Sequence, residues 1–277
     1  MGLRIATNIA SQTVQKNLKE VSNKSDASLE KLSSGKRITK AADDAAGLAI
    51  ATNLEAQTKG LRQATRNAND GISLVQTAEG GLNEVSNILV RMRELTVQAA
   101  SDTVGENERG FLDKEYQQLV AEVDRISEST TFNGTNLLNG EGSGSLDFQV
   151  GAFAGEQNQI AFDSSESDAS TGSIGISGSG ISDKGDALGS IEVIDGAIGK
   201  VSGQRATLGS IQSRLQSTVS NLEVQTINQD SARSVIQDVD VAEESAKLAA
   251  NQVVKSAGIT TLAQANALPN NALRLIG

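Results

Sequence analysis

The side chains in this chain that could do chemistry are mainly carboxylates. Two adjacent pairs stand out, Asp43-Asp44 and Glu243-Glu244, and Asp238-Val239-Asp240 is a third acidic group. Paired carboxylates act as general acid and base only when both reach the same substrate atom. Neighbours on a helix point about 100° apart, so these pairs favour solvated helix charge instead. The third group lacks the glycine and the distal glutamate of a calcium loop, so we expect no metal site there.

The residue inventory excludes several classes of enzyme. The chain has no His and no Cys, so Ser-His-Asp and Cys-His catalysis, His/Cys zinc sites and thiol redox chemistry lack their side chains. Its glycines complete neither GxGxxG nor GxxxxGK[ST], the patterns of phosphate-binding loops. The sequence therefore predicts no catalytic residues, no cofactor and no metal, and a protein that is not an enzyme.

Charge and hydropathy limit the classes of partner that the protein can bind. The formal net charge is −10 and the sequence pI is about 4.7, which argues against binding to nucleic acid or to an anionic membrane surface. No apolar run approaches the roughly 20 residues of a membrane-spanning helix. The chain starts MGLRIATNIASQTVQKN, which lacks the apolar core of a conventional secretory signal. If the protein leaves the cell, we expect it to use another route.

The elements that must position these side chains are mostly helices. Apolar and small residues recur at intervals of three and four from Val14 to Leu32, Leu61 to Ala99, Leu112 to Ile126 and Ile191 to Leu222. Ser33-Ser34-Gly35 interrupts the first stripe, and the Ala-rich stretch after Asp43-Asp44 begins the next helix. A helix over about 187–230 would be on the order of 65 Å long, so it needs an equally long partner. We predict that the chain runs out and returns alongside itself.

The middle of the chain has a different pattern. Leu146, Phe148 and Val150 alternate with polar residues between glycines, which predicts a small β-hairpin region. From Asp163 to Lys184 the chain is rich in Ser, Gly and Asp and poor in bulky apolar residues. We therefore expect a surface loop there that adds nothing to a core.

Both ends carry amphipathic helices that lie outside the central bundle. A lone helix in water is only marginally stable, so these ends should fold on meeting partners. Their apolar side chains are the predicted self-assembly residues. These are Ile5, Ile9, Leu18, Val21, Leu32, Leu248, Val253, Val254, Leu262, Leu268, Leu273 and Leu275.

Four segments give the chain a resemblance to bacterial flagellin. They read LSSGKRITKAADDAAGLAIA at 32–51, VRMRELTVQAAS at 90–101, TTFNGTNLL at 130–138 and LAQANALPNNALRL at 262–275. The resemblance implies a mainly α fold, a long antiparallel helical bundle or coiled coil with paired N- and C-terminal helices and a small β-hairpin region. It also implies a short, core-only form without large variable outer domains.

The same resemblance divides the chain by role. Residues 1–43 with 234–277 would form the inner tube of a filament, and residues 44–162 with 188–233 the outer tube. The Ser/Gly-rich loop at 163–187 would stand in place of the variable domains. The implied function is a structural subunit that polymerises into the bacterial flagellar filament used for motility.

Partners and location follow from the resemblance as expectations. The protein would be secreted through the flagellar type III export apparatus with an export chaperone, and would meet the filament cap and hook-junction proteins outside the cell. Many flagellins are recognised by a Toll-like innate immune receptor. The residues that match its recognition stretch are Arg91, Arg93, Glu94, Leu95, Val97, Gln98 and Glu115.

Two alternative functions remain open from the sequence. One is a flagellar hook-filament junction protein, which has the same architecture but is present in few copies. The other is a cytosolic coiled-coil adaptor, which would be fully helical as a monomer and would not form fibres.

Overall fold

The structure is a computed structural model that describes residues 7–140 and 144–276, with side chains described up to residue 267. Helices dominate the described residues, which confirms the expected mainly α fold with a small hairpin region. The helices are α1 (Ile9–Ser34), α2 (Ala45–Ala99), α3 (Glu106–Ser129), α4 (Thr171–Ile174), α5 (Lys184–Gln237) and α6 (Val241–Ile276), with a 3-10 turn at Glu156–Asn158.

Two short antiparallel hairpins make up the β-structure of the described residues. In the first, β1 (Thr131–Phe132) pairs with β2 (Thr135–Asn136). In the second, β3 (Ser145–Gln149) pairs with β4 (Gln159–Asp163), and Phe148 lies opposite Ile160. Asn133 and Gly134 join the first hairpin with positive φ angles of 50° and 80°, the conformation that a two-residue hairpin turn requires.

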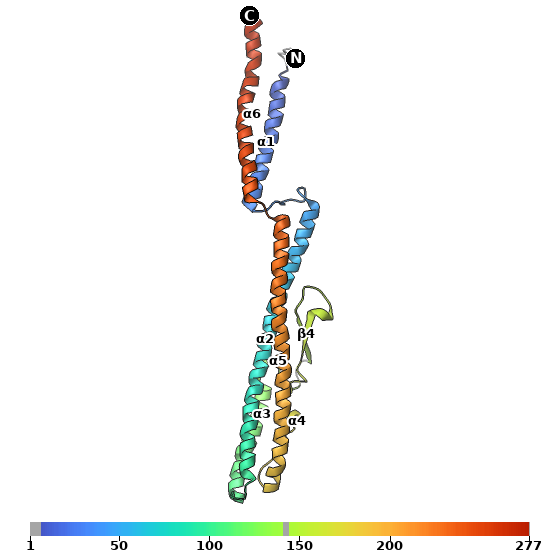
Figure 1. Ribbon diagram of the computed structural model, residues 1–277, viewed down its shortest axis with the longest axis vertical. Helices are drawn as coiled ribbons and strands as arrows, with labels where there is room; N and C mark the ends of the chain where they lie inside the picture. The colour runs from blue at the N-terminus through green and yellow to red at the C-terminus, as the bar shows by residue number, and fades with distance from the viewer. Residues whose placement is uncertain (1–6, 141–143, 277) are drawn as a thin grey trace. The chain divides into compact units, whose positions relative to one another are not determined.

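The chain forms two compact units, residues 1–56 with 228–277 and residues 57–227. In the first unit α1 and α6 lie side by side, with the start of α1 next to the last part of α6 (Figure 1). In the second unit α2, α3 and α5 run alongside one another, with the β3–β4 hairpin beside them (Figure 1). The assignment of inner-tube and outer-tube roles to 1–43 with 234–277 and to 44–162 with 188–233 stays a prediction.

Local side chains define where the helices begin and end. The Asn8 side chain accepts a hydrogen bond from the Ser11 amide and caps the start of α1, which ends at Gly35 with a φ of 70°. Before α2, the Asp44 carboxylate accepts a hydrogen bond from the Gly47 amide at 2.8 Å. The predicted interruption after Ser34 and the acidic start of α2 are therefore confirmed.

The core of the second unit is built by the predicted heptad stripes. Side chains of α2, α3 and α5 on these stripes are almost completely buried against one another. They include Val75, Leu82, Leu89 and Met92 from α2, Tyr116 and Val123 from α3, and Ile194, Val201, Leu208 and Leu215 from α5. Each such side chain contributes about 1.5–3 kcal/mol on burial, so this seam is the main source of stability.

The prediction that residues 163–184 add nothing to a core was wrong. Ala169, Ile174, Ile176 and Ile181 are buried and belong to the main core of the second unit. The segment has few large apolar residues, but the short helix α4 and the turns around it direct these few inward. A count of bulky residues missed this because isolated isoleucines among glycines and serines show no helix or strand period.

Helix α3 holds this segment in place by side-chain hydrogen bonds. The Asp124 carboxylate accepts bonds from the Thr171 amide at 2.9 Å and the Thr171 hydroxyl at 3.0 Å. The Asp113 carboxylate accepts a bond from the Ile181 amide at 2.8 Å. These acids satisfy backbone donors that would otherwise be lost when the isoleucines are buried.

A buried arginine closes the end of α2. The Arg109 guanidinium donates to the Ala99 carbonyl at 2.8 Å and to the Ser101 carbonyl at 3.0 Å. The last carbonyls of a helix have no partner within it, so Arg109 supplies donors that α2 lacks.

We predict that Arg109→Met destabilises the full chain by about 1–3 kcal/mol, because two carbonyls near the end of α2 lose charged donors. The matched control is Arg125→Met, since Arg125 is exposed and pairs only with Glu122 in its own helix. That change should cost no more than about 0.5 kcal/mol. Urea unfolding followed by circular dichroism measures both, and equal effects would contradict the capping role.

Candidate functional site: the terminal helix pair

The α1–α6 pair is antiparallel, and side-chain hydrogen bonds between the two helices define its register. The Asn8 side chain donates to the Ala265 carbonyl at 2.9 Å, and the Ser11 hydroxyl donates to the Asn266 side chain at 2.7 Å. Further along, the Lys255 amine donates to the Ser22 hydroxyl at 3.3 Å.

A close approach reinforces this register. A Cβ placed on Gly258 would lie 3.2 Å from the Leu18 side chain. The missing side chain at Gly258 therefore leaves room for Leu18, and a shift of one turn would replace Gly258 with a larger residue.

The seam of this pair is unusually polar. The buried residues of α1 are Ser11, Ser25 and Ser28. On α6 the seam includes the buried Glu244 and the half-buried Lys255. Polar residues at coiled-coil seam positions specify the register but lower the stability of the pair. The terminal pair is therefore held together less firmly than the helices of the second unit.

The predicted self-assembly residues fall into two groups. Leu18, Val21, Leu32, Leu248 and Leu262 are half-buried between the two helices, where they contribute to the pair itself.

The remaining predicted residues are largely exposed or are not described. Ile9 and Val253 are 57% and 69% exposed. Val254 is 52% exposed and lines a groove between the two helices with Leu18 and Val21. Ile5 lies outside the described residues, as do the side chains of Leu268, Leu273 and Leu275.

The exposed apolar surface of this pair also contains residues that the sequence prediction left out. Leu29 on α1 and Val241 and Ile259 on α6 are all more than half exposed. Val241 belongs to the apolar pattern of the last helix, seven residues before Leu248, but it was not among the predicted self-assembly residues. Leu29 and Ile259 lie off the stripes that were used to choose those residues.

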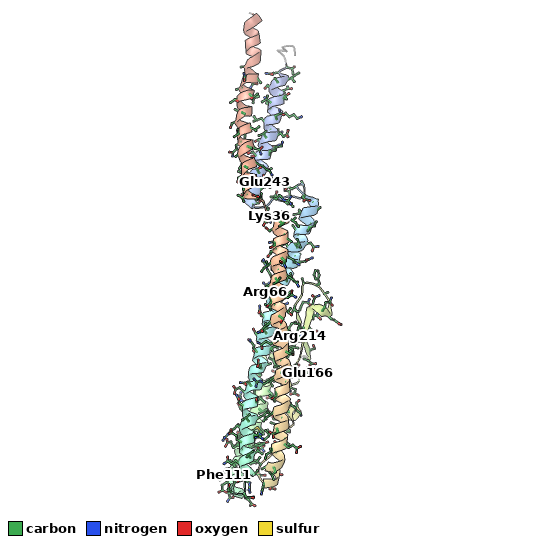
Figure 2. All side chains as sticks on the ribbon, in the orientation of Figure 1. Lys36, Arg66, Phe111, Glu166, Arg214 and Glu243 are labelled. Atoms are coloured by element: carbon green, nitrogen blue, oxygen red, sulfur yellow. The ribbon has the colours of Figure 1, made fainter. Side chains whose placement is uncertain are left out.

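Backbone contacts join the two linkers next to the pair, residues 35–37 and residues 237–239. Lys36 and Asp238 form an antiparallel bridge. The Arg37 amide donates to the Gln237 carbonyl at 2.7 Å and the Val239 amide donates to the Gly35 carbonyl at 3.1 Å. Figure 2 labels Lys36 in this region and Glu243 at the start of α6.

Two of the acidic residues noted in the sequence, Asp240 and Asp43, accept backbone hydrogen bonds next to the helices that follow them. Asp240 accepts hydrogen bonds from the amides of Ala242 and Glu243 and so begins α6. Asp43 accepts from the Lys40 amide and from the amide and hydroxyl of Thr39, and these hydrogen bonds lower the pKa of its carboxyl. Within the described residues no cluster of three or more metal-ligating side chains occurs.

A second surface carries the arginines of the predicted receptor stretch. The Arg91 guanidinium contacts Glu115 on α3 at 2.9 Å and Glu94 in its own helix at 3.0 Å. Arg93 contacts Asp195 on α5 at 2.6 Å, and its hydrogen bond lowers the pKa of that carboxyl. All of these side chains are about half exposed, so the ion pairs are solvated.

The other residues of that stretch are not all accessible. Val97 is 50% exposed and Gln98 is also exposed, and both line a shallow groove with Val90, Arg93 and Glu94. The expectation that Leu95 belongs to an accessible face was wrong, because it is only 1% exposed. Leu95 lies on the heptad stripe of α2 and packs into the core.

Comparison with known proteins identifies the family. The model of the bacterial flagellin N-terminal helical region matches residues 5–143, and that of the C-terminal helical region matches residues 191–276. The chain belongs to the bacterial flagellin family. The two matches cover α1 to α3 and most of α5 and α6, the elements that build both units.

Individual relatives support the same conclusion. A flagellin of Halalkalibacterium halodurans is 41% identical over 97% of this chain and 98% of its own length. A flagellar filament core protein of Brachyspira hyodysenteriae is 38% identical over 98% of this chain and 99% of its own length. The crystal structure of Bacillus cereus flagellin is similar with a TM-score of 0.51 and 31% identity, over 57% of this chain and 88% of that one.

Family membership settles the broad function. This flagellin is a short, core-only form and a structural subunit that polymerises into the bacterial flagellar filament used for motility. The relatives are named flagellin or filament core protein, which favours the filament subunit over the junction protein and the cytosolic adaptor. Among the described helices, none combines the length and apolar character needed to cross a membrane.

We predict that Lys255→Leu stabilises the terminal pair by about 1–2 kcal/mol, because an apolar side chain replaces a charged one at the seam. Hydrogen exchange of the α1 and α6 amides in the unpolymerised chain measures this change. The control is Lys24→Leu, since Lys24 pairs with Glu20 on the exposed side of α1 at 2.8 Å. Equal protection in both variants would contradict the seam position of Lys255.

Proposed function

We propose that the terminal helix pair is the surface through which copies of this flagellin polymerise. The observation that carries the proposal is the exposed apolar surface of the pair, where Val253 is 69% and Val241 61% exposed. Burying side chains of this size contributes about 1.5–3 kcal/mol each. Monomeric proteins seldom leave such a surface uncovered, so neighbouring subunits are its expected cover.

The polar seam supports the same proposal. The leucines between the two helices are only half-buried and the buried residues of α1 are serines, so the pair gains little stability on its own. Contacts between subunits then supply the burial that the seam lacks, so the pair becomes rigid as the filament grows. Different surfaces on each subunit meet head to tail, and such contacts produce an open helical polymer when the rotation between copies does not close a ring.

Export and location complete the proposal. We infer that the chain leaves the cell through the flagellar type III apparatus with an export chaperone, meets the hook-junction and cap proteins, and resides in the extracellular filament. A chain without Cys cannot form a disulfide loop that would obstruct a narrow channel. We infer a mechanical rather than an enzymatic role, since Asp43 and Asp44 accept backbone hydrogen bonds before α2, and Glu243 and Glu244 pair with Lys247.

Deletion of residues 1–30 or 245–277 should abolish polymerisation, because either deletion removes one partner of the α1–α6 pair. Purified chains are seeded with sheared filament fragments, and growth is followed by negative-stain electron microscopy. Circular dichroism shows whether the remaining helices are still folded. Filaments formed by either truncated chain would contradict the proposal.

A point substitution sharpens this test. Val253→Asp should raise the concentration needed for growth at least tenfold, because it places a charge in the contact. Val253→Ile keeps the apolar character and should leave growth nearly unchanged.

A second function, recognition by a Toll-like innate immune receptor, is favoured by one observation. Arg91 forms exposed ion pairs with Glu115 on α3 and with Glu94, and Glu94 lines a groove with the exposed Val97. This arrangement presents a fixed charge pattern next to an apolar side chain, which suits a protein partner.

We expect Arg91→Ala to reduce the response of receptor reporter cells at least several-fold. The control is Arg214→Ala, an exposed arginine of α5 outside this cluster. No response to the intact chain, or equal responses to both variants, would remove the receptor hypothesis.

A further inference from the structure

A groove lies between α2 and α5 within the second unit. It has a volume of about 400 Å³ and is lined by Arg62, Thr65, Arg66, Glu223, Thr226 and Ile227. Ile227 is 64% exposed and the nearby Val224 is 57% exposed. The groove therefore has an apolar wall and a charged rim, and its apolar wall is in contact with solvent.

The opposite side of the same helix seam is covered by the β3–β4 hairpin. Leu61, Ala64 and Leu222 form a small buried cluster, and Ala152 from the hairpin loop packs against it. A Cβ on Gly60 would lie 3.2 Å from Ala152, so α2 and the loop approach closely. This thin core is closed by the hairpin on one side and open at the groove on the other.

Positions around α2 confirm that the two sides differ. Asn67 donates to the Gln149 carbonyl at 3.0 Å, and Gly71 lies against the Phe148 ring, so these two residues and Gly60 face the hairpin. At about 100° per residue, Arg62 lies about 160° and Arg66 about 120° around the helix axis from Gly60. Figure 2 labels Arg66 on this part of α2.

The hairpin loop carries an exposed aromatic side chain next to Ala152. Phe153 is 60% exposed. The Gln149 side chain donates to the carbonyls of Gly151 and Phe153 at 3.0 and 2.9 Å, which holds the loop in shape. Glu156 follows in the 3-10 turn. The loop therefore presents a fixed aromatic knob with an acidic neighbour.

We propose that Phe153 of one copy docks into the α2–α5 groove of a neighbouring copy in the filament. Phe153 would cover the apolar wall at Ile227, and Glu156 would lie toward the arginines of the rim. Because knob and groove lie on opposite sides of the helix seam, each copy can offer one to each of two neighbours, so the contact can repeat from subunit to subunit along a filament. The proposal rests on the filament function and names a contact outside the terminal helices.

The chain has no cysteine, so engineered thiols report the contact cleanly. Filaments are grown from a mixture of Ala154→Cys and Thr226→Cys chains, treated with a short bismaleimide, and separated by denaturing gel electrophoresis. We expect a cross-linked heterodimer that neither variant forms alone. The control pairs Ala154→Cys with Ser217→Cys, an exposed position on the other face of α5, and should give little product.

The outcomes separate the docking contact from the filament function. Filaments visible by electron microscopy without the Ala154–Thr226 product, or with equal product from the Ser217 control, would overturn the docking proposal alone. Failure of the unmodified chain to polymerise would overturn both. If a variant polymerises poorly alone, it is grown with an excess of unmodified chain, and the product is measured in the mixed filament.

A second measurement tests the charges at the rim. Arg66→Glu should weaken polymerisation several-fold, and Glu156→Lys in the same chain should restore most of it. The Arg66 side chain donates to the Gln63 side chain of its own helix at the exposed surface, so its replacement should leave the bundle folded. Loss of growth without restoration by Glu156→Lys would count against the pairing of these two surfaces.

Discussion

Burial of the long apolar stripe of α2 against α3 and α5 is the interaction on which the rest of the structure depends. It fixes where the hairpins, the segment around α4 and the exposed arginines can lie, because each is attached to one of these helices. The stripe contains residues such as Leu82, Leu89 and Met92 with essentially no exposed surface. Close packing of this kind tolerates few alternatives, so the second unit presents its surfaces in a fixed arrangement.

The terminal pair follows the opposite design. Its leucines are only half-buried and the buried residues of α1 are serines, whereas the other seam buries leucines and valines completely. Other apolar side chains of the pair, among them Val253 and Ile259, are more than half exposed. One chain thus combines a unit with an extensive buried core and a unit that leaves much apolar surface exposed. This division suits a subunit that must remain separate until it reaches the growing end of a polymer.

The sequence predicted the features that depend on a regular spacing of apolar residues. Heptads located the long helices and their buried faces, and alternation around Phe148 located the second hairpin. It was insufficient where burial depends on a few residues brought in by tertiary contacts. Ile174, Ile176 and Ile181 are buried because Asp113 and Asp124 bind the backbone beside them, and no local pattern marks such an arrangement.

The same limit applies to the candidate sites. The receptor stretch was chosen by resemblance, which transfers residue types without exposure, so it included the buried Leu95. The self-assembly set was chosen from apolar residues, which gave both the seam residues of the pair and its outward residues. The alignment of α1 against α6, which contacts of Asn8, Leu18 and Lys255 define, shows which residues face the partner helix and which face outward.

Surface charge contributes little to holding such a polymer together. Ion pairs such as Arg91–Glu115 and Arg93–Asp195 are about half exposed, and pairs of that kind are worth at most about 1 kcal/mol. With a net charge of −10, subunits also repel one another at long range. Polymerisation must therefore rest on apolar burial at a few places where the charge is locally balanced. The two proposed contacts, at the outward face of the terminal pair and at the groove between α2 and α5, expose apolar side chains such as Val253 and Ile227.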